Sequence, residues 1–159
     1  MPASGKGAAV TLLSSQFEYF WAVFSPDAKW MAYTSSESGN FEVYAMPIQL
    51  EPAPRVIGEK RRISATGGWR PRWRPDGREL YYLSADNHLM SVAVNSYQFA
   101  QPKALFRLRS PSSPSSSLHG GYDISPDGQR FLIDTMLPGG TPPFNVVVNW
   151  QLLLKNPGQ

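Results

Sequence analysis

Cysteine is absent from this chain of 159 residues. The absence excludes disulfide bonds, zinc sites built on thiolates and catalysis by a cysteine nucleophile. No apolar run approaches the ~20 residues that a transmembrane helix requires, so we expect no membrane insertion. The first residues also lack a basic segment followed by an apolar one, and we predict no signal peptide in this chain. These absences do not choose between a periplasmic and a cytoplasmic location.

Motifs that carry catalysis or hold cofactors are missing as well. The sequence contains no Gly-x-Ser-x-Gly nucleophile elbow, no His-Glu-x-x-His zinc motif and no glycine loop for phosphate or dinucleotide binding. Its two histidines, His88 and His119, both lie beside predicted turns. We therefore predict no catalytic residue, no metal site and no cofactor, and expect that the protein is not an enzyme.

The most informative feature that is present is a repeat of about 50 residues. Its core is a turn motif that occurs as Pro26-Asp27-Ala28, Pro75-Asp76-Gly77 and Pro126-Asp127-Gly128, each time between two apolar segments. Proline presets the first corner of a type I turn, aspartate accepts hydrogen bonds from nearby backbone amides, and glycine adopts the left-handed position that follows. The motif predicts a β-hairpin with a glycine bulge.

Two details of this motif carry predictions. We interpret the three aspartates as acceptors for the amides of their own turns, in preference to a ring of carboxylates around a channel. Ala28 occupies the place that glycine holds in the other two copies. A β-carbon in the left-handed conformation costs roughly 1 kcal/mol, so the first turn is expected to be strained.

The segments around each turn alternate like short strands, and 13 glycines and 15 prolines argue against long helices. Four antiparallel strands in each repeat describe one blade of a β-propeller. We predict an all-β propeller with three four-stranded blades, at about residues 20–64, 69–109 and 120–150, the third abbreviated. The serine-rich segment 110–117 is predicted to be a loop that joins the second blade to the third.

Three blades are fewer than the four to eight that closed propellers contain, and their stack would leave two apolar faces uncovered. Two chains related by a two-fold axis would close a six-bladed ring, so the expected partner is a second copy of the chain. Residues 9–14 are predicted as a strand that completes a blade of the partner. Residues 1–8 are expected to be a disordered or tag-like terminus, and residues 156–159 a tail. A piece of a longer propeller that associates adventitiously is the alternative.

Several segments resemble a known family. The segment 71–83, Pro-Arg-Trp-Arg-Pro-Asp-Gly-Arg-Glu-Leu-Tyr-Tyr-Leu, together with Leu-Met-Ser-Val at 89–92 and Asn-Val-Val-Val-Asn-Trp at 145–150, resembles the TolB-like and WD-like β-propeller repeats of bacteria. The resemblance covers roughly residues 12–155 and implies a non-catalytic scaffold that binds proteins or ligands.

The same resemblance leaves two other functions open. Bacterial propellers of this kind often follow a serine/threonine kinase or a winged-helix domain, which implies a sensor or output domain of a kinase or regulator. Others accompany peptidases, which implies a propeller whose peptidase is encoded elsewhere. An upstream kinase gene would favour the first of these, and a downstream hydrolase gene the second.

A basic segment supplies the candidate binding site. Net charge is only +3, but residues 55–78 contain eight basic and two acidic residues. The segment 69–74, Trp-Arg-Pro-Arg-Trp-Arg, is the predicted innermost strand of the second blade, and alternation would place its arginines on one side and its tryptophans and proline on the other. The candidate residues are Lys60, Arg61, Trp69, Arg70, Arg72 and Arg74.

Such a patch would suit an acidic peptide, an acidic protein or a small anion. The alternative is structural: the arginines stack on tryptophan between blades and pair with turn carboxylates such as Asp76. Nucleic-acid binding is not expected, because the aromatic residues of this segment alternate as core residues and form no exposed stacking platform.

Overall fold

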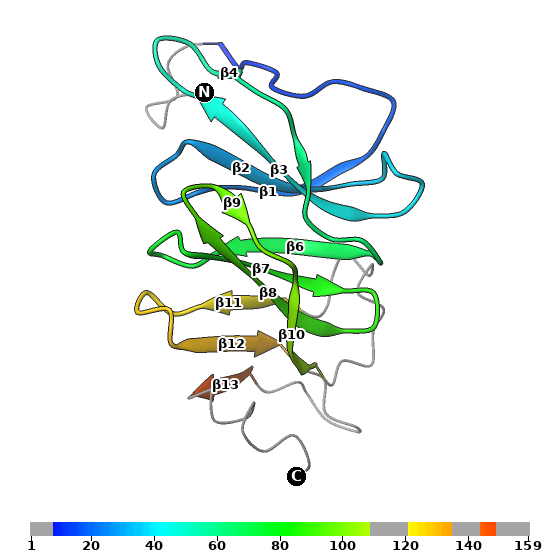
Figure 1. Cartoon of the computed structure of the whole chain (residues 1–159), viewed down its shortest axis with the longest axis vertical. Coiled ribbons are helices and arrows are strands. Elements are labelled where there is room, and N and C mark those ends of the chain that lie inside the picture. Colours follow the sequence, from blue (N-terminus) through cyan, green and yellow to red (C-terminus); the bar gives the residue numbers. More distant parts are fainter. Residues whose placement is uncertain (1–7, 109–120, 135–143, 149–159) are drawn as a thin grey trace.

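The structure, a computed structural model, describes residues 8–108, 121–134 and 144–148. These residues form strands in three antiparallel sheets and contain no helix, which confirms the predicted all-β architecture. Figure 1 shows the three sheets stacked in chain order along the long axis of the molecule. The predictions for residues 1–7, for the serine-rich segment 110–117 and for the tail at 156–159 lie outside the described residues.

Strand bounds define each sheet. The first sheet contains β1 (Tyr19–Phe24), β2 (Trp30–Ser35), β3 (Glu42–Gln49), β4 (Arg55–Val56) and β5 (Arg61–Arg62). The second contains β6 (Gly68–Trp73), β7 (Glu79–Ser84), β8 (His88–Asn95), β9 (Gln98–Phe99) and β10 (Lys103–Arg107), and the third contains β11 (Tyr122–Ile124), β12 (Arg130–Asp134) and β13 (Phe144–Val148). In the first sheet β4 and β5 both pair with β3, and in the second sheet β9 and β10 both pair with β8. The outermost strand of each of these sheets is therefore divided into two shorter strands.

None of the described segments is a helix that is long and apolar enough to cross a membrane.

The repeated turns have one geometry in all three sheets. The residue after each aspartate is left-handed, with φ of 56° at Ala28, 72° at Gly77 and 67° at Gly128. One carboxylate oxygen of each aspartate accepts a hydrogen bond from the backbone N–H two residues later, at 3.2 Å for Asp27, 3.0 Å for Asp76 and 2.9 Å for Asp127. Each carboxylate therefore holds its own turn closed, and Ala28 carries the expected left-handed strain.

Apolar packing between sheets forms the core. Between the first and second sheets, Trp30, Ala32, Val43, Ala45 and Ile63 face Trp73, Leu80, Tyr82, Val92 and Val94. Between the second and third sheets, Tyr81, Leu83, Leu89, Leu105 and Leu108 face Tyr122, Phe131 and Ile133. Successive residues of β7 thus point to opposite neighbours, which explains why this strand is apolar throughout: both of its faces are covered.

β1 and β6 are each interrupted by a β-bulge at an equivalent place. The pairing register of both strands shifts next to Trp21 and Arg70, which adopt φ of 51° and 55°. Two residues of the bulged strand then oppose one residue of the partner strand. The repeat therefore reproduces this irregularity as well as the turns.

The bulge in β6 overturns the alternation predicted for residues 69–74. Trp69 pairs with Leu83 and Arg72 pairs with Tyr81. Directly paired residues share a face, and Leu83 and Tyr81 both pack toward the third sheet. Trp69 and Arg72 thus pair with residues of one face, which strict alternation would forbid, although the Trp69 ring reaches Phe41 of the first sheet, with ring centres 6.4 Å apart.

The N-terminal segment packs on the first sheet without joining it as a strand. Residues 8–18 form no strand in the single chain, and the strand expected at 9–14 in a blade of a partner stays a prediction. Leu12 and Leu13 instead pack on the free face of the first sheet, against a buried cluster that includes Met31, Tyr33 and Tyr44. That face is apolar and lacks a preceding sheet, so the chain uses its own N-terminal segment to cover part of it.

A buried carboxylate connects the first sheet to the linker, residues 63–67, that leads into the second sheet. Glu42 is only 3% exposed. Its two oxygens accept hydrogen bonds from the Ser64 hydroxyl and from the Gly67 backbone N–H. Ser64 in turn accepts a bond from the Val43 N–H at 2.7 Å. Gly68 allows this close approach, because a β-carbon there would lie 2.5 Å from the Ser64 hydroxyl oxygen.

Replacing Ala28 by glycine is expected to stabilise the protein, because glycine adopts positive φ without the steric cost of a β-carbon. The gain is about 1 kcal/mol less the entropy that glycine adds to the unfolded chain, and a thermal melt should rise by up to about 4 °C. Gly77→Ala is the matched control, since its new β-carbon meets only Pro26 at 3.8 Å and tests φ alone. It should melt lower, and an unchanged melt for Ala28→Gly would contradict the prediction.

Removing the Ser64 hydroxyl is expected to destabilise the fold. Ser64→Ala leaves the buried Val43 N–H and one Glu42 oxygen without their partner, at a cost of about 1–3 kcal/mol in the free energy of unfolding. Urea denaturation measures this loss. Ser38→Ala is the control, because Ser38 is exposed and donates only to the Asn40 carbonyl, and its effect should stay within about 0.5 kcal/mol. Equal losses in the two variants would refute the role given to Ser64.

Candidate functional site

The structure places the residues of the predicted basic patch on two sheets. Lys60 immediately precedes β5 and Arg61 belongs to it, at the outer edge of the first sheet. The Lys60 ammonium lies 2.5 Å from Glu37 Oε2 and 5.7 Å from the centre of the Tyr44 ring. This ion pair engages Lys60 within its own sheet, away from the arginines of β6.

Arg61 is engaged by the second sheet. Its guanidinium donates to the Tyr97 carbonyl at 3.1 Å and to Gln98 Oε1 at 3.3 Å, and it lies 5.8 Å from the centre of the Trp30 ring. Arg61 therefore joins the outer edges of the first two sheets. This contact is the structural alternative anticipated from the sequence, an arginine stacked on tryptophan between neighbouring sheets.

The arginines on and after β6 have separate partners. Arg70 lies over the Trp21 ring, 4.9 Å from its centre, so the two bulge residues of β1 and β6 contact each other. Arg72 donates to the Pro71 carbonyl at 3.1 Å. Arg74, just beyond β6, lies 3.5 Å from an Asp76 oxygen. These contacts are the structural roles anticipated as the alternative, and the binding of an anionic partner by these residues stays a prediction.

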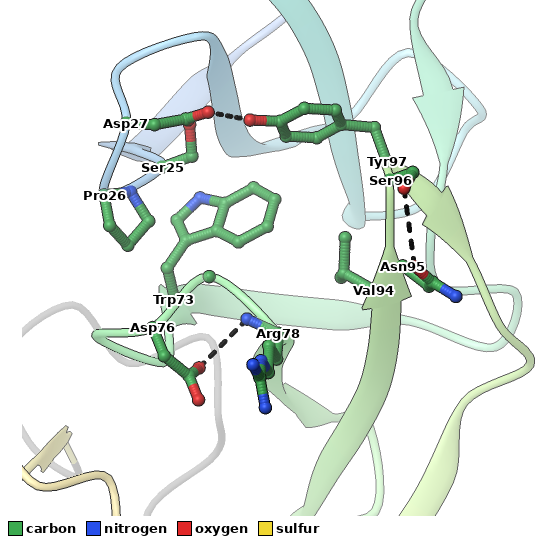
Figure 2. A pocket seen from close by; sticks show the side chains of 11 residues that line it. Ser25, Pro26, Asp27, Trp73, Asp76, Arg78, Val94, Asn95, Ser96 and Tyr97 are labelled. Atoms are coloured by element: carbon green, nitrogen blue, oxygen red, sulfur yellow. Dashed lines mark hydrogen bonds between the residues drawn. The ribbon is translucent and has the colours of Figure 1, made fainter.

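A pocket lies between the repeated turns of the first and second sheets (Figure 2). This turn pocket has a volume of about 340 Å³ and is lined by residues 25–27, 76–78 and 94–97, with Trp73 among them. The Tyr97 hydroxyl donates to Asp27, and Figure 2 shows this bond spanning the gap above the Trp73 ring. Asp27 and Asp76 already accept hydrogen bonds from their own turns, and Asp27 also accepts one from Tyr97. The residues of the turn pocket therefore connect the two sheets and leave no free carboxylate group dedicated to a ligand.

A larger cavity opens where the linker between the two sheets passes the β2–β3 loop. This linker cavity has a volume of about 730 Å³. Its walls are Glu18, Ser36, residues 39–42, residues 65–67, Trp69 and Ala85. Two of these residues are carboxylates, Glu18 and Glu42, and none is basic. Phe41 and Trp69 supply apolar ring surface, so the cavity combines negative charge with aromatic walls.

An aromatic row leads from the linker cavity toward the bulge residues. Trp69 and Phe41 have ring centres 6.4 Å apart, Phe41 and Phe20 are 5.8 Å apart, and Phe20 and Trp21 are 5.5 Å apart. Arg70 covers Trp21 at the end of this row. Of these residues the sequence analysis selected only Trp69 and Arg70. Glu42 could have been noticed, because it is a charged residue at the start of an apolar strand.

The neighbourhood of His88 lacks the geometry of a hydrolytic site. The Ser84 hydroxyl donates to Asp86 at 2.6 Å, and His88 Nδ1 lies 2.9 Å from the other Asp86 oxygen. The carboxylate thus stands between serine and histidine, whereas nucleophilic catalysis requires the imidazole beside the hydroxyl. The Ser84 hydrogen bond, helped by His88, holds the pKa of the Asp86 carboxyl below its ordinary value. In the part of the chain that the structure describes, no three His, Asp or Glu residues are grouped to hold a metal ion.

Comparison with known proteins gives information on the fold. No protein-family profile and no curated protein sequence matches the chain. Among solved structures, TolB from Acinetobacter baumannii superposes with a TM-score of 0.60 at 22% identity, over 86% of this chain and 31% of TolB. An oligogalacturonate lyase from Vibrio parahaemolyticus superposes with a TM-score of 0.53 at 14% identity, over 84% of this chain and 37% of the lyase.

The chain thus spans about a third of the length of each of these structures. At these identities the likeness concerns the fold and carries neither activity nor ligand. It agrees with the stacked antiparallel sheets, with their repeated turns, and with the resemblance noted in the sequence. The chain has the fold of a TolB-like β-propeller, and its sheets are the blades.

Proposed function

We propose that the chain is a non-catalytic binding scaffold whose two open blade faces dock on further blades, supplied by a second copy of the chain. One observation carries the proposal: each open face exposes one large apolar residue, Phe24 on the first blade and Leu132 on the third. Their equivalents in the second blade, Trp73 and Tyr81, are buried by neighbouring blades. The proposal therefore rests on the same apolar packing that holds the described blades together.

At the first blade the open face is marked by Phe24. Its equivalent in the second blade, Trp73, is 7% exposed because the first blade covers it, whereas Phe24 is 53% exposed. Val10 and Phe17, which flank Leu12 and Leu13 in the chain, are also exposed. The packing of Leu12 and Leu13 on this face leaves Phe24 uncovered, so an apolar surface remains for a partner.

At the third blade the open face is marked by Leu132. Its equivalent in the second blade is Tyr81, which is fully buried against the third blade, whereas Leu132 is 41% exposed. The two open faces are thus of complementary kinds. Among the described residues, no blade precedes the first face and no blade follows the second.

A second copy supplies both missing neighbours at once. The third blade of one copy would precede the first blade of the other, and a two-fold axis would repeat the contact. Six blades fall within the four to eight of closed propellers. The same kind of blade contact would then be used throughout the ring, with no new type of interface.

The non-catalytic part of the proposal is supported by the arrangement at His88. Its imidazole contacts Asp86 and not the Ser84 hydroxyl, which serves the backbone of its own turn. The turn aspartates are engaged in the same structural way. These groups stabilise turns and leave no serine or carboxylate among them paired with a base.

Light scattering during size exclusion tests the docking of two copies. The unmodified chain should elute at twice the monomer mass, whereas Phe24→Asp and Leu132→Asp should each elute as a monomer, because a charge on either face opposes apolar packing. Ala104→Asp is the matched control: Ala104 is an exposed apolar residue on β10 of the second blade, which lies between the other two blades. It should stay dimeric, and a monomeric unmodified chain would refute the proposal.

A further inference from the structure

The linker cavity has a charge that the chain itself does not balance. Glu42 is almost completely buried, and its recorded partners are a hydroxyl and a backbone N–H, both neutral. Glu18 lines the same cavity. Within residues 8–108 and 121–134, no ion pair engages either carboxylate. Keeping a buried carboxylate ionised outside an ion pair is costly, so a cation that enters the cavity is attracted to it.

Aromatic rings line the same space. Phe41 and Trp69 contribute to its wall, and their ring centres are 6.4 Å apart. The electron-rich face of an aromatic ring attracts a cation, and tryptophan does so most strongly. The same attraction between a cation and an aromatic ring occurs at the far end of the aromatic row, where the Arg70 guanidinium lies over the Trp21 ring.

From these observations we infer that the linker cavity binds a guanidinium group. A guanidinium is planar and stacks on aromatic rings, and its N–H groups form a fork that matches carboxylate oxygens. Ser36, Asn40 and Thr66 line the cavity and add side-chain oxygens for the remaining donors. A volume of about 730 Å³ admits the group together with the carbon chain that carries it.

The site is held in shape by groups that a ligand need not move. Gly67 has φ of 93°, and a β-carbon at this position would lie 2.9 Å from Ala85 and 3.2 Å from the Trp69 ring. The Trp69 ring therefore rests close to the linker backbone. The hydrogen bonds of Glu42 to Ser64 and Gly67 fix its carboxylate, and each oxygen keeps capacity for a second hydrogen bond.

This inference goes beyond the proposed docking of two copies, because both walls of the cavity belong to one chain. The Phe24→Asp variant, expected to be monomeric, should still bind the cation. Loss of cation binding would therefore leave the docking proposal intact, and a monomeric unmodified chain would leave the cation site intact.

Nuclear magnetic resonance titration of the full chain with methylguanidinium chloride tests the site. We expect saturable shifts of the Gly67 amide and of one tryptophan indole N–H, and no saturable shift with neutral methylurea at equal concentration. Sodium chloride at matched ionic strength controls for screening. Equal responses to methylguanidinium and methylurea, or no saturable response to methylguanidinium, would overturn the inference.

Variants locate the binding. Glu18→Gln and Trp69→Leu should each weaken methylguanidinium binding by about three- to tenfold, because each removes one attraction for the cation. Glu59→Gln is the matched control, since Glu59 is an exposed glutamate that does not line the cavity, and it should bind as the unmodified chain does. Backbone amide spectra verify that each variant is folded. Unchanged affinity in both cavity variants would contradict the inference.

The origin of the guanidinium is decided by a second pair of ligands. A tripeptide Gly-Arg-Gly, blocked at both ends, is compared with methylguanidinium and with blocked Gly-Gln-Gly. Tighter binding of the arginine peptide than of methylguanidinium supports an arginine side chain of a protein as the ligand. Equal or weaker binding supports a free small guanidinium compound. Binding of the glutamine peptide as tight as that of the arginine peptide would overturn the requirement for a cation.

Discussion

Apolar packing of each blade on the next is the interaction on which the rest of this structure depends. The second blade shows it most fully, because Leu80 and Tyr82 of β7 face the first blade while Tyr81 faces the third. A sheet with two apolar faces cannot be stable alone in water. The stacking visible in Figure 1 is the direct consequence, and so is the exposure of Phe24 and Leu132 where the stack ends.

The same packing creates the cavities between the first two blades. The strands of the two blades pack closely, whereas the turns at one end and the β2–β3 loop and linker at the other leave a cavity between them. On the turn side Tyr97 spans this space and contacts Asp27. On the linker side the Phe41 and Trp69 rings contact each other, and the hydrogen bonds of Glu42 come from two neutral donors, Ser64 and Gly67. The linker cavity is therefore negatively charged because the Glu42 carboxylate lines it and forms no ion pair among the described residues.

Much of the fold could be predicted because it is encoded locally. The Pro-Asp-Gly motif predicts the left-handed residue at Gly77, and even predicts Ala28 as a strained copy, since a turn is determined by neighbouring residues. Strand alternation failed in β6, because the bulge at Arg70 adds one residue to the pairing and leaves no mark in the pattern of apolar residues. Residues 9–14 have the composition of a strand, but in the single chain they form none, and Leu12 and Leu13 pack on an apolar face of the first sheet.

The candidate site was less predictable than the fold. Lys60 and Arg70 are near in sequence, yet one lies beside the outer edge of a blade and the other contacts Trp21 on β1, because the chain crosses from one blade to the next between them. Conversely, Glu18, Glu42 and Trp69 are far apart in sequence and line one cavity. The sequence by itself determined the turns, the strand-rich blades and their repetition, because these depend on residues within a few positions of each other. Only the tertiary structure decided which charges are neutralised and which face a cavity, because that depends on contacts between blades that no local pattern records.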